Sequence, residues 1–183
     1  MMNIKEKIKN IDIKRVLKEL YPYVIIIVVV VLFRTFIATP VRVDGSSMDS
    51  TLKNGDILIL NKLDKNYERF DVVVVKVTVD GHTSKLVKRI IGMPGESIEY
   101  KENDLYIDGK IVKDMAPERT NDFTLKELYD LENIPENTYF VMGDNRSDSR
   151  DSRDYTVGLI KYEDIVGTTI LRLFPLNKIG KFN

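Results

Sequence analysis

Two adjacent serines lie in the segment VDGSSMDSTLKNGD, from Val43 to Asp56, and a serine hydroxyl can act as a nucleophile. It attacks a carbonyl carbon only when a neighbouring base accepts its proton. The chain has a single histidine, His82, so a serine–histidine–aspartate arrangement would have to use that residue. Glycine and serine also build ordinary turns, so the segment alone does not separate a nucleophile from a loop, or Ser46 from Ser47.

A lysine within an apolar strand offers a second kind of base. In the run KLVKRIIG, residues 85–92, strand alternation places Lys88 on the same face as Leu86 and Ile90. Burial disfavours the ammonium form and lowers its pKa, which leaves a neutral amine that can accept a proton. The commoner alternative is a lysine whose stem is buried while its ammonium reaches water. Serine–lysine pairs are a known variant of the serine–histidine–aspartate arrangement.

A third segment, MGDNRSDSRDSRDY from Met142 to Tyr155, alternates acidic and arginine side chains. A solvated loop and a calcium loop are alternatives to a catalytic role. The spacing does not match the calcium-binding pattern, and the arginines would repel a cation. We therefore expect ion pairs within the loop to brace it, and its serine hydroxyls to be able to orient a lysine amine.

Length and composition limit the classes of protein that fit. The chain has 183 residues, 28 Lys plus Arg against 28 Asp plus Glu, and no cysteine. This length predicts one principal domain. A zero net charge provides no basic surplus for nucleic acid, and the lack of cysteine excludes disulfides and thiolate metal sites. We expect no metal and no cofactor.

The segment YPYVIIIVVVVLFRTFIA, Tyr21 to Ala38, is apolar enough to anchor the chain in a membrane, and Arg34 near its end can extend to the interface. A buried strand and a cleaved signal peptide are the alternatives. The basic residues before it and the tyrosines at its start argue against a strand. Cleavage after Ala38 would put Phe36 at the −3 position, where a small residue is required. The sequence therefore predicts an uncleaved signal-anchor.

Three parts follow from this interpretation. Residues 1–20 form a basic cytoplasmic N-terminus, residues 21–39 a transmembrane signal-anchor, and residues 40–183 an extracytoplasmic domain. Within that domain, the more polar stretch from about 100 to 137 is expected to form a subsidiary lobe.

Short strand-like runs dominate the chain after the anchor, and glycine-containing turns separate them. LYIDGKIV is typical of a tight hairpin, because Asp108-Gly109 suits a type I′ turn. Only TLKELYDL, residues 124–131, is expected to be helical. The valine run 72–75 is apolar on both faces, which fits either a strand buried on both sides or a surface resting on lipid. The predicted strands are 56–60, 70–79, 85–92, 97–100, 104–112, 138–144 and 167–174.

Together these segments resemble bacterial type I signal peptidase, a membrane-anchored serine protease that removes signal peptides from exported preproteins. The matching motifs occur in the family's order: FRTFIATPVRVDGSSM, STLKNGD, KRIIGMPGE, YFVMGDNRSDSRDSR and VGLIKYEDIVG. The resemblance covers residues 20–175. It implies a mostly β, signal-peptidase-like domain related to that of LexA, a barrel or sandwich with a small β-rich subsidiary lobe, preceded by one transmembrane helix.

The resemblance also implies roles for individual residues. Ser47 matches the nucleophile, Lys88 the general base, and Ser149 a hydroxyl that holds the lysine amine in place. The supporting residues are Arg89 with its partner Asp144, Arg146, and Asp151 and Arg153, which brace the same loop. The residues that match the apolar lining of shallow substrate pockets are Val43, Met48, Leu52 and Val87.

Two positions depart from the family pattern. Gly45 stands where some members carry a second hydroxyl donor for the oxyanion hole, to which the backbone N–H of Ser47 would contribute. Ser50 replaces a usual proline, which bears on the rigidity of the turn after Met48. His82 receives no role, and a eukaryotic-type signal peptidase would place histidine where Lys88 stands.

The expected function is that of a membrane-bound serine endopeptidase that removes N-terminal signal peptides after small residues of the Ala-x-Ala type. Its expected surroundings are the plasma membrane, preprotein substrates and nearby Sec-type export machinery, without nucleic acid. A LexA-like repressor is one alternative, but it would carry a DNA-binding domain in place of the anchor. A catalytically silent, membrane-tethered paralogue that binds peptides or pilus subunits is another. Loss of Ser47, Lys88 or Ser149 would have favoured that paralogue, and all three are present.

Overall fold

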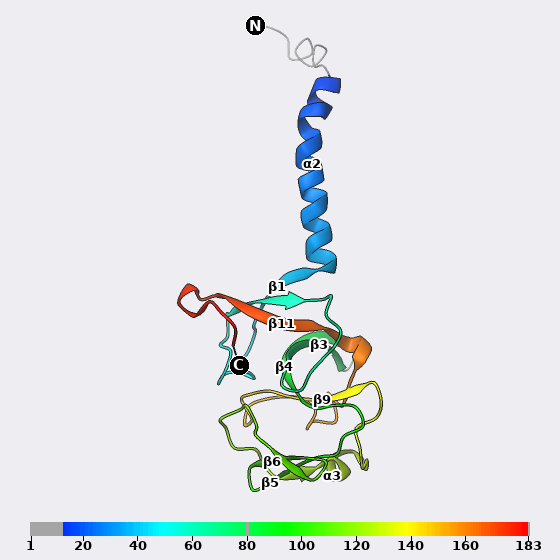
Figure 1. Ribbon diagram of the computed structural model, residues 1–183, viewed down its shortest axis with the longest axis vertical. Coiled ribbons are helices and arrows are strands. Elements are labelled where there is room, and N and C mark those ends of the chain that lie inside the picture. The colour runs from blue at the N-terminus through cyan, green and yellow to red at the C-terminus, as the bar shows by residue number, and fades with distance from the viewer. Residues whose placement is uncertain (1–12, 80, 183) are drawn as a thin grey trace. The chain divides into compact units, whose positions relative to one another are not determined.

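The computed structural model describes residues 13–79 and 81–182 (Figure 1). The chain divides into two compact units, with the boundary between Ile37 and Ala38, and each unit is described by itself. Residues 1–12, Asp80 and Asn183 lie outside the described residues. They include part of the predicted basic N-terminus and one residue of the predicted Asp80-Gly81 turn.

The first unit contains one long helix, α2 (Ile13–Phe36). Its segment Val16–Phe36 has 21 residues with a mean hydropathy of 2.3 and is long and apolar enough to cross a membrane. At 1.5 Å per residue such a segment is about 31 Å long, close to the thickness of the hydrocarbon core of a bilayer. Ala38 and Thr39, the last two residues of the predicted anchor (21–39), begin a strand of the second unit.

The second unit is built from two antiparallel sheets (Figure 1). The seven-stranded sheet has the order β1-β2-β11-β3-β4-β9-β10, and the four-stranded sheet has the order β7-β6-β5-β8. The strands of the larger sheet are β1 (Ala38–Arg42), β2 (Ile57–Asn61), β3 (Val72–Val79), β4 (His82–Gly92), β9 (Thr138–Met142), β10 (Ile160–Lys161) and β11 (Ile165–Phe174). Those of the smaller sheet are β5 (Ile98–Lys101), β6 (Asp104–Ile107), β7 (Lys110–Val112) and β8 (Phe123–Thr124).

The hairpin of β3 and β4 forms the centre of the larger sheet. Its register runs from Val72 opposite Arg89 to Val79 opposite His82, and it places Val73 opposite Lys88. The valine run is buried on both faces by protein, because Val73 and Val75 join one apolar cluster while Val72 joins another. The structure therefore supports the strand buried on both sides, since packing within the unit accounts for the burial of the run.

The smaller sheet forms the subsidiary lobe, and two local predictions are confirmed there. Asp108 and Gly109 have positive φ values of 51° and 71° between β6 and β7, as a type I′ turn requires. Thr124 caps the start of helix α3 (Leu125–Tyr129), where the side chains of Thr124 and Glu127 each accept a hydrogen bond from the other's backbone N–H. The short 3₁₀ helices η1 (Tyr162–Asp164) and η2 (Leu176–Lys178) complete the described elements.

The sequence did not predict strands β1, β8 and β10. The last two have only two residues each, and β1 contains Pro40, which lacks a backbone donor and is tolerated on an edge strand. One edge of β1 pairs with β2, and its other edge pairs with no strand among the described residues. Strand β4 also has an unpaired edge over part of its length, because β9 pairs only with its end, from Arg89 to Gly92. Among the described residues, the larger sheet thus has unpaired backbone at the outer edge of β1, at residues 82–88 of β4 and at the outer edge of β10.

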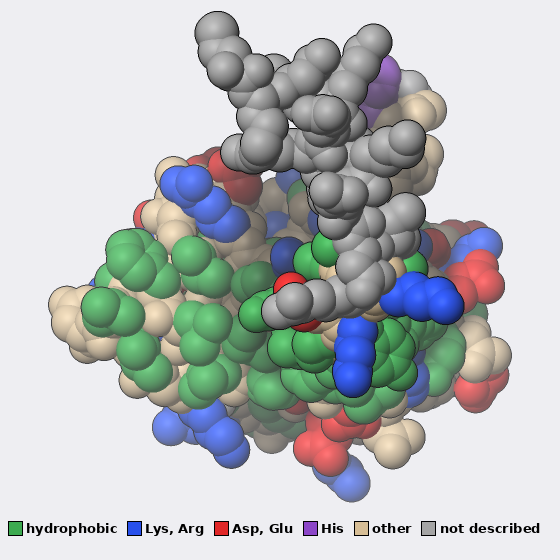
Figure 2. Space-filling view, turned by 90° about the horizontal axis from the view of Figure 1, so that it is seen from above, with side chains coloured by type: hydrophobic (Ala, Val, Ile, Leu, Met, Phe, Trp, Pro, Cys, Tyr) green, Lys and Arg blue, Asp and Glu red, His purple; other side chains and the backbone are tan. Residues whose placement is uncertain are grey.

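Hydrophobic side chains also remain exposed at the end of β11 and in the segment that follows it. Figure 2 shows hydrophobic side chains gathered over this end of the unit, where Figure 1 places the turn after β11. Leu176 is 75% exposed, and its exposed neighbours are Leu173, Phe174 and Ile179. Exposed apolar groups of this extent are associated with contacts to membranes or other proteins.

Candidate active site

The two serines lie in a loop between β1 and β2, here called the serine loop (residues 43–56). Backbone hydrogen bonds close its base, because the Val43 N–H donates to Asp56 O at 2.8 Å and the Gly55 N–H donates to Val43 O at 2.9 Å. Inside the loop the Leu52 N–H donates to Met48 O at 2.7 Å, which makes a tight turn directly after Ser47. Met48 and Leu52 are 1% and 0% exposed, so the loop is fixed to the core by apolar packing.

Ser47 lies within hydrogen-bonding distance of Lys88. The Lys88 Nζ to Ser47 Oγ distance is 2.6 Å, and Lys88 is only 2% exposed. The hydroxyl of Ser46 instead donates to Asp148 Oδ2 at 2.7 Å in an exposed position. Of the two serines, the structure brings to the lysine Ser47, which the resemblance matched to the nucleophile. His82 lies exposed at the beginning of β4.

Burial changes the protonation of Lys88. It lowers the pKa of the Lys88 amine to about 8, because the apolar surroundings disfavour the ammonium form. The negative charges of Asp151 and Asp144 oppose this effect, and the positive charge of Arg153 adds to it. Lys88 can therefore hold a neutral amine at a moderately basic pH, which an exposed lysine does not.

A buried ion pair joins β4 to the charged loop (residues 142–155). The Nε and Nη2 atoms of Arg89 donate to the two carboxylate oxygens of Asp144 at 2.8 and 2.6 Å, and the two side chains are 3% and 0% exposed. Arg89 also donates to Phe70 O at 2.8 Å. Since Arg89 follows Lys88 in the strand, this two-point pair fixes the backbone that carries the lysine.

A second ion pair braces the charged loop from within. Arg153 donates to both carboxylate oxygens of Asp151 at 2.9 Å, and Asp151 also accepts the Gly143 N–H at 2.9 Å. Burial acts to raise the pKa of the Asp151 carboxyl, but the bonds and charge of Arg153, together with hydrogen bonds from Ser149 and Gly143, outweigh burial and hold that pKa below its usual value. Asp151 therefore remains a carboxylate at neutral pH.

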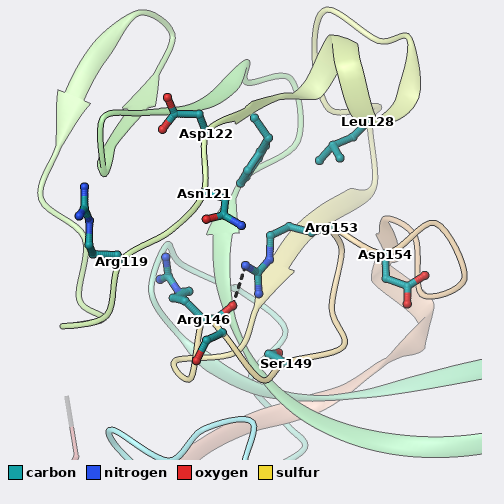
Figure 3. A pocket seen from close by; sticks show the side chains of 10 residues that line it. Arg119, Asn121, Asp122, Leu128, Arg146, Ser149, Arg153 and Asp154 are labelled. Atoms are coloured by element: carbon teal, nitrogen blue, oxygen red, sulfur yellow. Dashed lines mark hydrogen bonds between the residues drawn. The ribbon is translucent and has the colours of Figure 1, made fainter.

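Arg146 links the charged loop to the subsidiary lobe. Its guanidinium donates to Tyr100 Oη at 2.7 Å, to Thr120 Oγ1 at 2.9 Å and to Asp114 Oδ1 at 2.8 Å. Its backbone oxygen accepts a bond from Arg153 Nη1 at 2.9 Å, drawn as the dashed line in Figure 3. The lobe thus supports the same loop that contacts the lysine strand.

The hydroxyl of Ser149 is placed differently from the expectation. Its Oγ is buried and forms no hydrogen bond to Lys88, and it acts instead on Asp151, where it helps to lower the pKa of the carboxyl. Ser149 lies at the wall of a cavity of about 520 Å³ between the charged loop and the lobe (Figure 3). Its hydroxyl packs closely against Gly143.

The four residues expected to line the substrate pockets come together in one apolar cluster. Val43, Met48 and Leu52 are buried in it, and Val87 packs against it from β4. Gly45, which lacks the hydroxyl found in some family members, donates its N–H to Asn54 Oδ1 at 3.2 Å. The described residues contain no group of three or more His, Asp or Glu side chains that could hold a metal ion.

Two residues of the charged loop were not singled out from the sequence although both contact the serine loop. The Asn145 N–H donates to Ser47 O at 3.0 Å, and its side-chain Nδ2 donates to Ser46 O at 3.1 Å. Gly143 leaves no room for a side chain, because a Cβ there would meet Ser47 O and the Ser149 side chain. The glycine in the run MGDNR was the available signal, since a glycine often marks a close approach of backbone.

Comparisons with known proteins agree on one family. Residues 15–174 match the family described as Signal peptidase, peptidase S26. Signal peptidase I S of Bacillus subtilis (strain 168) is 37% identical over an alignment of 189 residues, gaps included. The alignment covers 97% of this chain and 100% of the relative. Signal peptidase I T of the same strain is 39% identical over 168 residues, covering 85% and 84% of the two chains.

Among solved structures, a signal peptidase I from Enterococcus faecalis V583 is similar to this chain with 34% sequence identity and a TM-score of 0.49. The similarity covers 56% of this chain and 96% of that one.

Replacement of Gly143 by alanine tests the close approach of the two loops. The added Cβ would collide with backbone at Ser47, so Ser47 must move relative to Lys88. We expect Gly143→Ala to lower peptidase activity by about 100-fold, the size of effect that a shift of about 1 Å produces. Gly109→Ala is the control, because it has a strained φ but open space around its Cβ, and it should lose stability but little activity. Full activity in Gly143→Ala would show that the close packing of Gly143 against Ser47 is not needed to place the serine.

Proposed function

The chain belongs to the signal peptidase S26 family, so it is a serine peptidase that cleaves signal peptides from preproteins, and we propose that Ser47 and Lys88 form its catalytic dyad. We propose further that cleavage follows small residues in an Ala-x-Ala pattern. The observation that carries the proposal is the 2.6 Å contact between Lys88 Nζ and Ser47 Oγ at a buried lysine.

The dyad divides the reaction into two steps. The neutral Lys88 amine accepts the hydroxyl proton as Ser47 Oγ attacks the scissile carbonyl carbon. The resulting ammonium gives that proton to the leaving amine as the C–N bond breaks, which leaves an acyl ester on Ser47. Water then attacks the ester, Lys88 takes the proton of the water, and the proton returns to Ser47 Oγ as the peptide acid leaves.

Charge that develops on the carbonyl oxygen needs hydrogen-bond donors. The backbone N–H of Ser47 is the donor that the proposal assigns to this oxyanion hole. Gly45 has no hydroxyl, and its own N–H is bonded to Asn54. The oxyanion hole of this chain therefore depends on backbone donors at the serine loop, whose position Asn145 and Gly143 fix.

The unpaired edges of β1 and β4 support binding of an extended substrate. A peptide placed beside them can form main-chain hydrogen bonds as an added strand. Its alternate side chains would then face the cluster of Val43, Met48, Leu52 and Val87. The first three are 3%, 1% and 0% exposed, so they present almost no surface, and the proposal gives the substrate side chains only shallow depressions over them. Shallow apolar depressions accept alanine and exclude larger side chains.

The apolar helix α2 supports a location in the plasma membrane. Basic residues precede the apolar segment, so the N-terminus is proposed to lie in the cytoplasm and the second unit outside. A preprotein whose signal peptide crosses the same membrane presents its cleavage site at that outer surface. The Sec-type export machinery that delivers such preproteins is therefore the proposed neighbour of the enzyme.

Serine replacements test the choice of nucleophile. Ser47→Ala removes the attacking oxygen and should reduce cleavage of an Ala-x-Ala preprotein to background. Ser46→Ala removes only the exposed bond to Asp148 and should leave most of the activity. The measurement is the rate of product formation, with N-terminal sequencing of the product to fix the cleaved bond. Reversed phenotypes would contradict the assignment, and peptide binding without cleavage by the parent would favour the silent paralogue.

The pH dependence tests the base. Below its pKa of about 8, Lys88 is protonated and cannot accept the Ser47 proton, so kcat/KM should fall with decreasing pH and level off above that value. Lys88→Arg should be inactive at any working pH, because a guanidinium stays protonated. His82→Gln is the control and should keep the parent profile. An active Lys88→Arg enzyme, or a profile that changes with His82, would rule out this mechanism.

Protease accessibility tests the orientation. In intact cells or spheroplasts, external protease should digest residues after Pro40 and spare a tag placed at the N-terminus. Cells permeabilised with detergent serve as the control, since both parts should then be digested. Protection of the second unit in intact spheroplasts would contradict the proposed orientation.

A further inference from the structure

The serine loop has a second support on the side of β11. Arg172 of β11 donates from Nη1 to Asp56 Oδ2 at 2.9 Å and to Thr51 O at 3.4 Å. Both acceptors belong to the serine loop. The side chains of Arg172 and Asp56 are 12% and 5% exposed, so the ion pair is largely removed from water and its attraction is weakly screened.

Asp56 is the residue through which this support reaches the base of the loop. Its backbone oxygen accepts the Val43 N–H at 2.8 Å, and its Oδ2 accepts the Lys53 N–H at 3.1 Å. These bonds join the two ends of the loop that carries Ser47. A movement of Arg172 away from Asp56 would therefore leave a buried carboxylate short of its charged partner and loosen the base of the loop.

The segment after η2 holds Arg172 in place. Gly180 pairs with Arg172 through two backbone bonds, from the Arg172 N–H to Gly180 O at 2.9 Å and from the Gly180 N–H to Arg172 O at 3.2 Å. The ring of Phe182 then lies 5.7 Å from the Arg172 guanidinium carbon. An aromatic ring at this distance attracts the cation and excludes water from it.

Phe182 also packs against the apolar cluster in which the serine loop is embedded. It packs, partly buried, against the apolar cluster that contains Met48 and Leu52, the residues that fix the turn after Ser47. One ring thus touches both the guanidinium that bonds to the loop and the cluster in which the loop is embedded.

We propose that Arg172 and Phe182 are positioning residues for Ser47, acting through Asp56 and the serine loop. The inference rests on the proposed dyad, because it assumes that the Ser47 Oγ to Lys88 Nζ distance limits the reaction. The family match ends at residue 174, so Gly180 and Phe182 lie beyond it and family membership assigns them no role.

The position of Ser47 depends on this support separately from the position of Lys88. Lys88 is fixed by its own strand and by the Arg89–Asp144 pair. Ser47 is fixed by the serine loop, which Asn145 and Gly143 contact from the charged loop and Arg172 contacts from β11. A small displacement of the loop therefore changes the 2.6 Å distance between the two reacting groups without disturbing the lysine.

The test compares four forms of the full chain in detergent, with a synthetic preprotein peptide as substrate: the parent, Phe182→Ala, Phe182→Tyr and Ile111→Ala. Phe182→Ala should lower kcat by about tenfold or more and change KM by a smaller factor, because the displaced serine affects the chemical step. Some change in KM is expected, because Phe182 also packs against the cluster proposed to receive the substrate side chains. Phe182→Tyr keeps a ring and should restore kcat to near the parent value. Ile111 is 64% exposed in the subsidiary lobe, and its replacement by alanine should change neither constant.

Folding is separated from positioning by measuring kcat well below the unfolding temperature of each variant. Circular dichroism and size-exclusion chromatography check that each variant is folded and has the size of the parent. Arg172→Met and the double variant Arg172→Met/Phe182→Ala complete a cycle. The kcat of the double variant should be little lower than that of Arg172→Met alone, because the two residues act as one unit.

Parent kcat in a less stable Phe182→Ala variant would show that the segment only stabilises the fold, and it would overturn the proposal. Independent, additive losses in the cycle would overturn it as well. A parent enzyme that cleaves, but depends on neither Ser47 nor Lys88, would instead refute the proposed function on which the inference rests.

Discussion

The structure depends on one costly constraint, the burial of Lys88 beside a serine. An ammonium ion is strongly disfavoured in an apolar interior, so a buried lysine needs either a carboxylate partner or a lowered pKa. At 2% exposure the desolvation of Lys88 outweighs the attraction of nearby carboxylates, and its pKa falls to about 8. The same burial that threatens stability provides the neutral amine that the proposed mechanism requires.

The carboxylates near Lys88 are kept from forming a salt bridge with it by arginines. Asp144 is bound at both oxygens by Arg89, and Asp151 is bound at both oxygens by Arg153. Lys88 forms no ion pair with any residue in the described ranges 13–79 and 81–182. The two arginines thus satisfy the acidic groups of the charged loop and leave the lysine amine facing Ser47.

The two reacting groups are supported by different parts of the unit. Lys88 lies on a strand of the central hairpin, whose valines are buried on both faces, and this makes its backbone rigid. Ser47 lies on a loop, where the backbone has few sheet bonds, so contacts from the charged loop at Asn145 and from Arg172 take over that role. Close packing at Gly143 brings the charged loop against the serine loop at Ser47.

Much of this protein was determined by its sequence alone, because the relevant physics is local. Alternation in KLVKRIIG placed Lys88 on an apolar face, Asp108-Gly109 specified a turn, and the run before Ala38 specified an apolar helix. Resemblance to a family supplied the pairing of Arg89 with Asp144, which the structure forms.

Contacts between distant segments were decided only by the tertiary structure. It formed the contact of Ser47 with the lysine, which the resemblance had implied, left the Ser149 hydroxyl without a hydrogen bond to Lys88, and buried the valine run in protein. It also joined Arg172 and Phe182 to the serine loop. Such contacts link residues far apart in the chain, and they depend on strand order and register, which no local periodicity encodes.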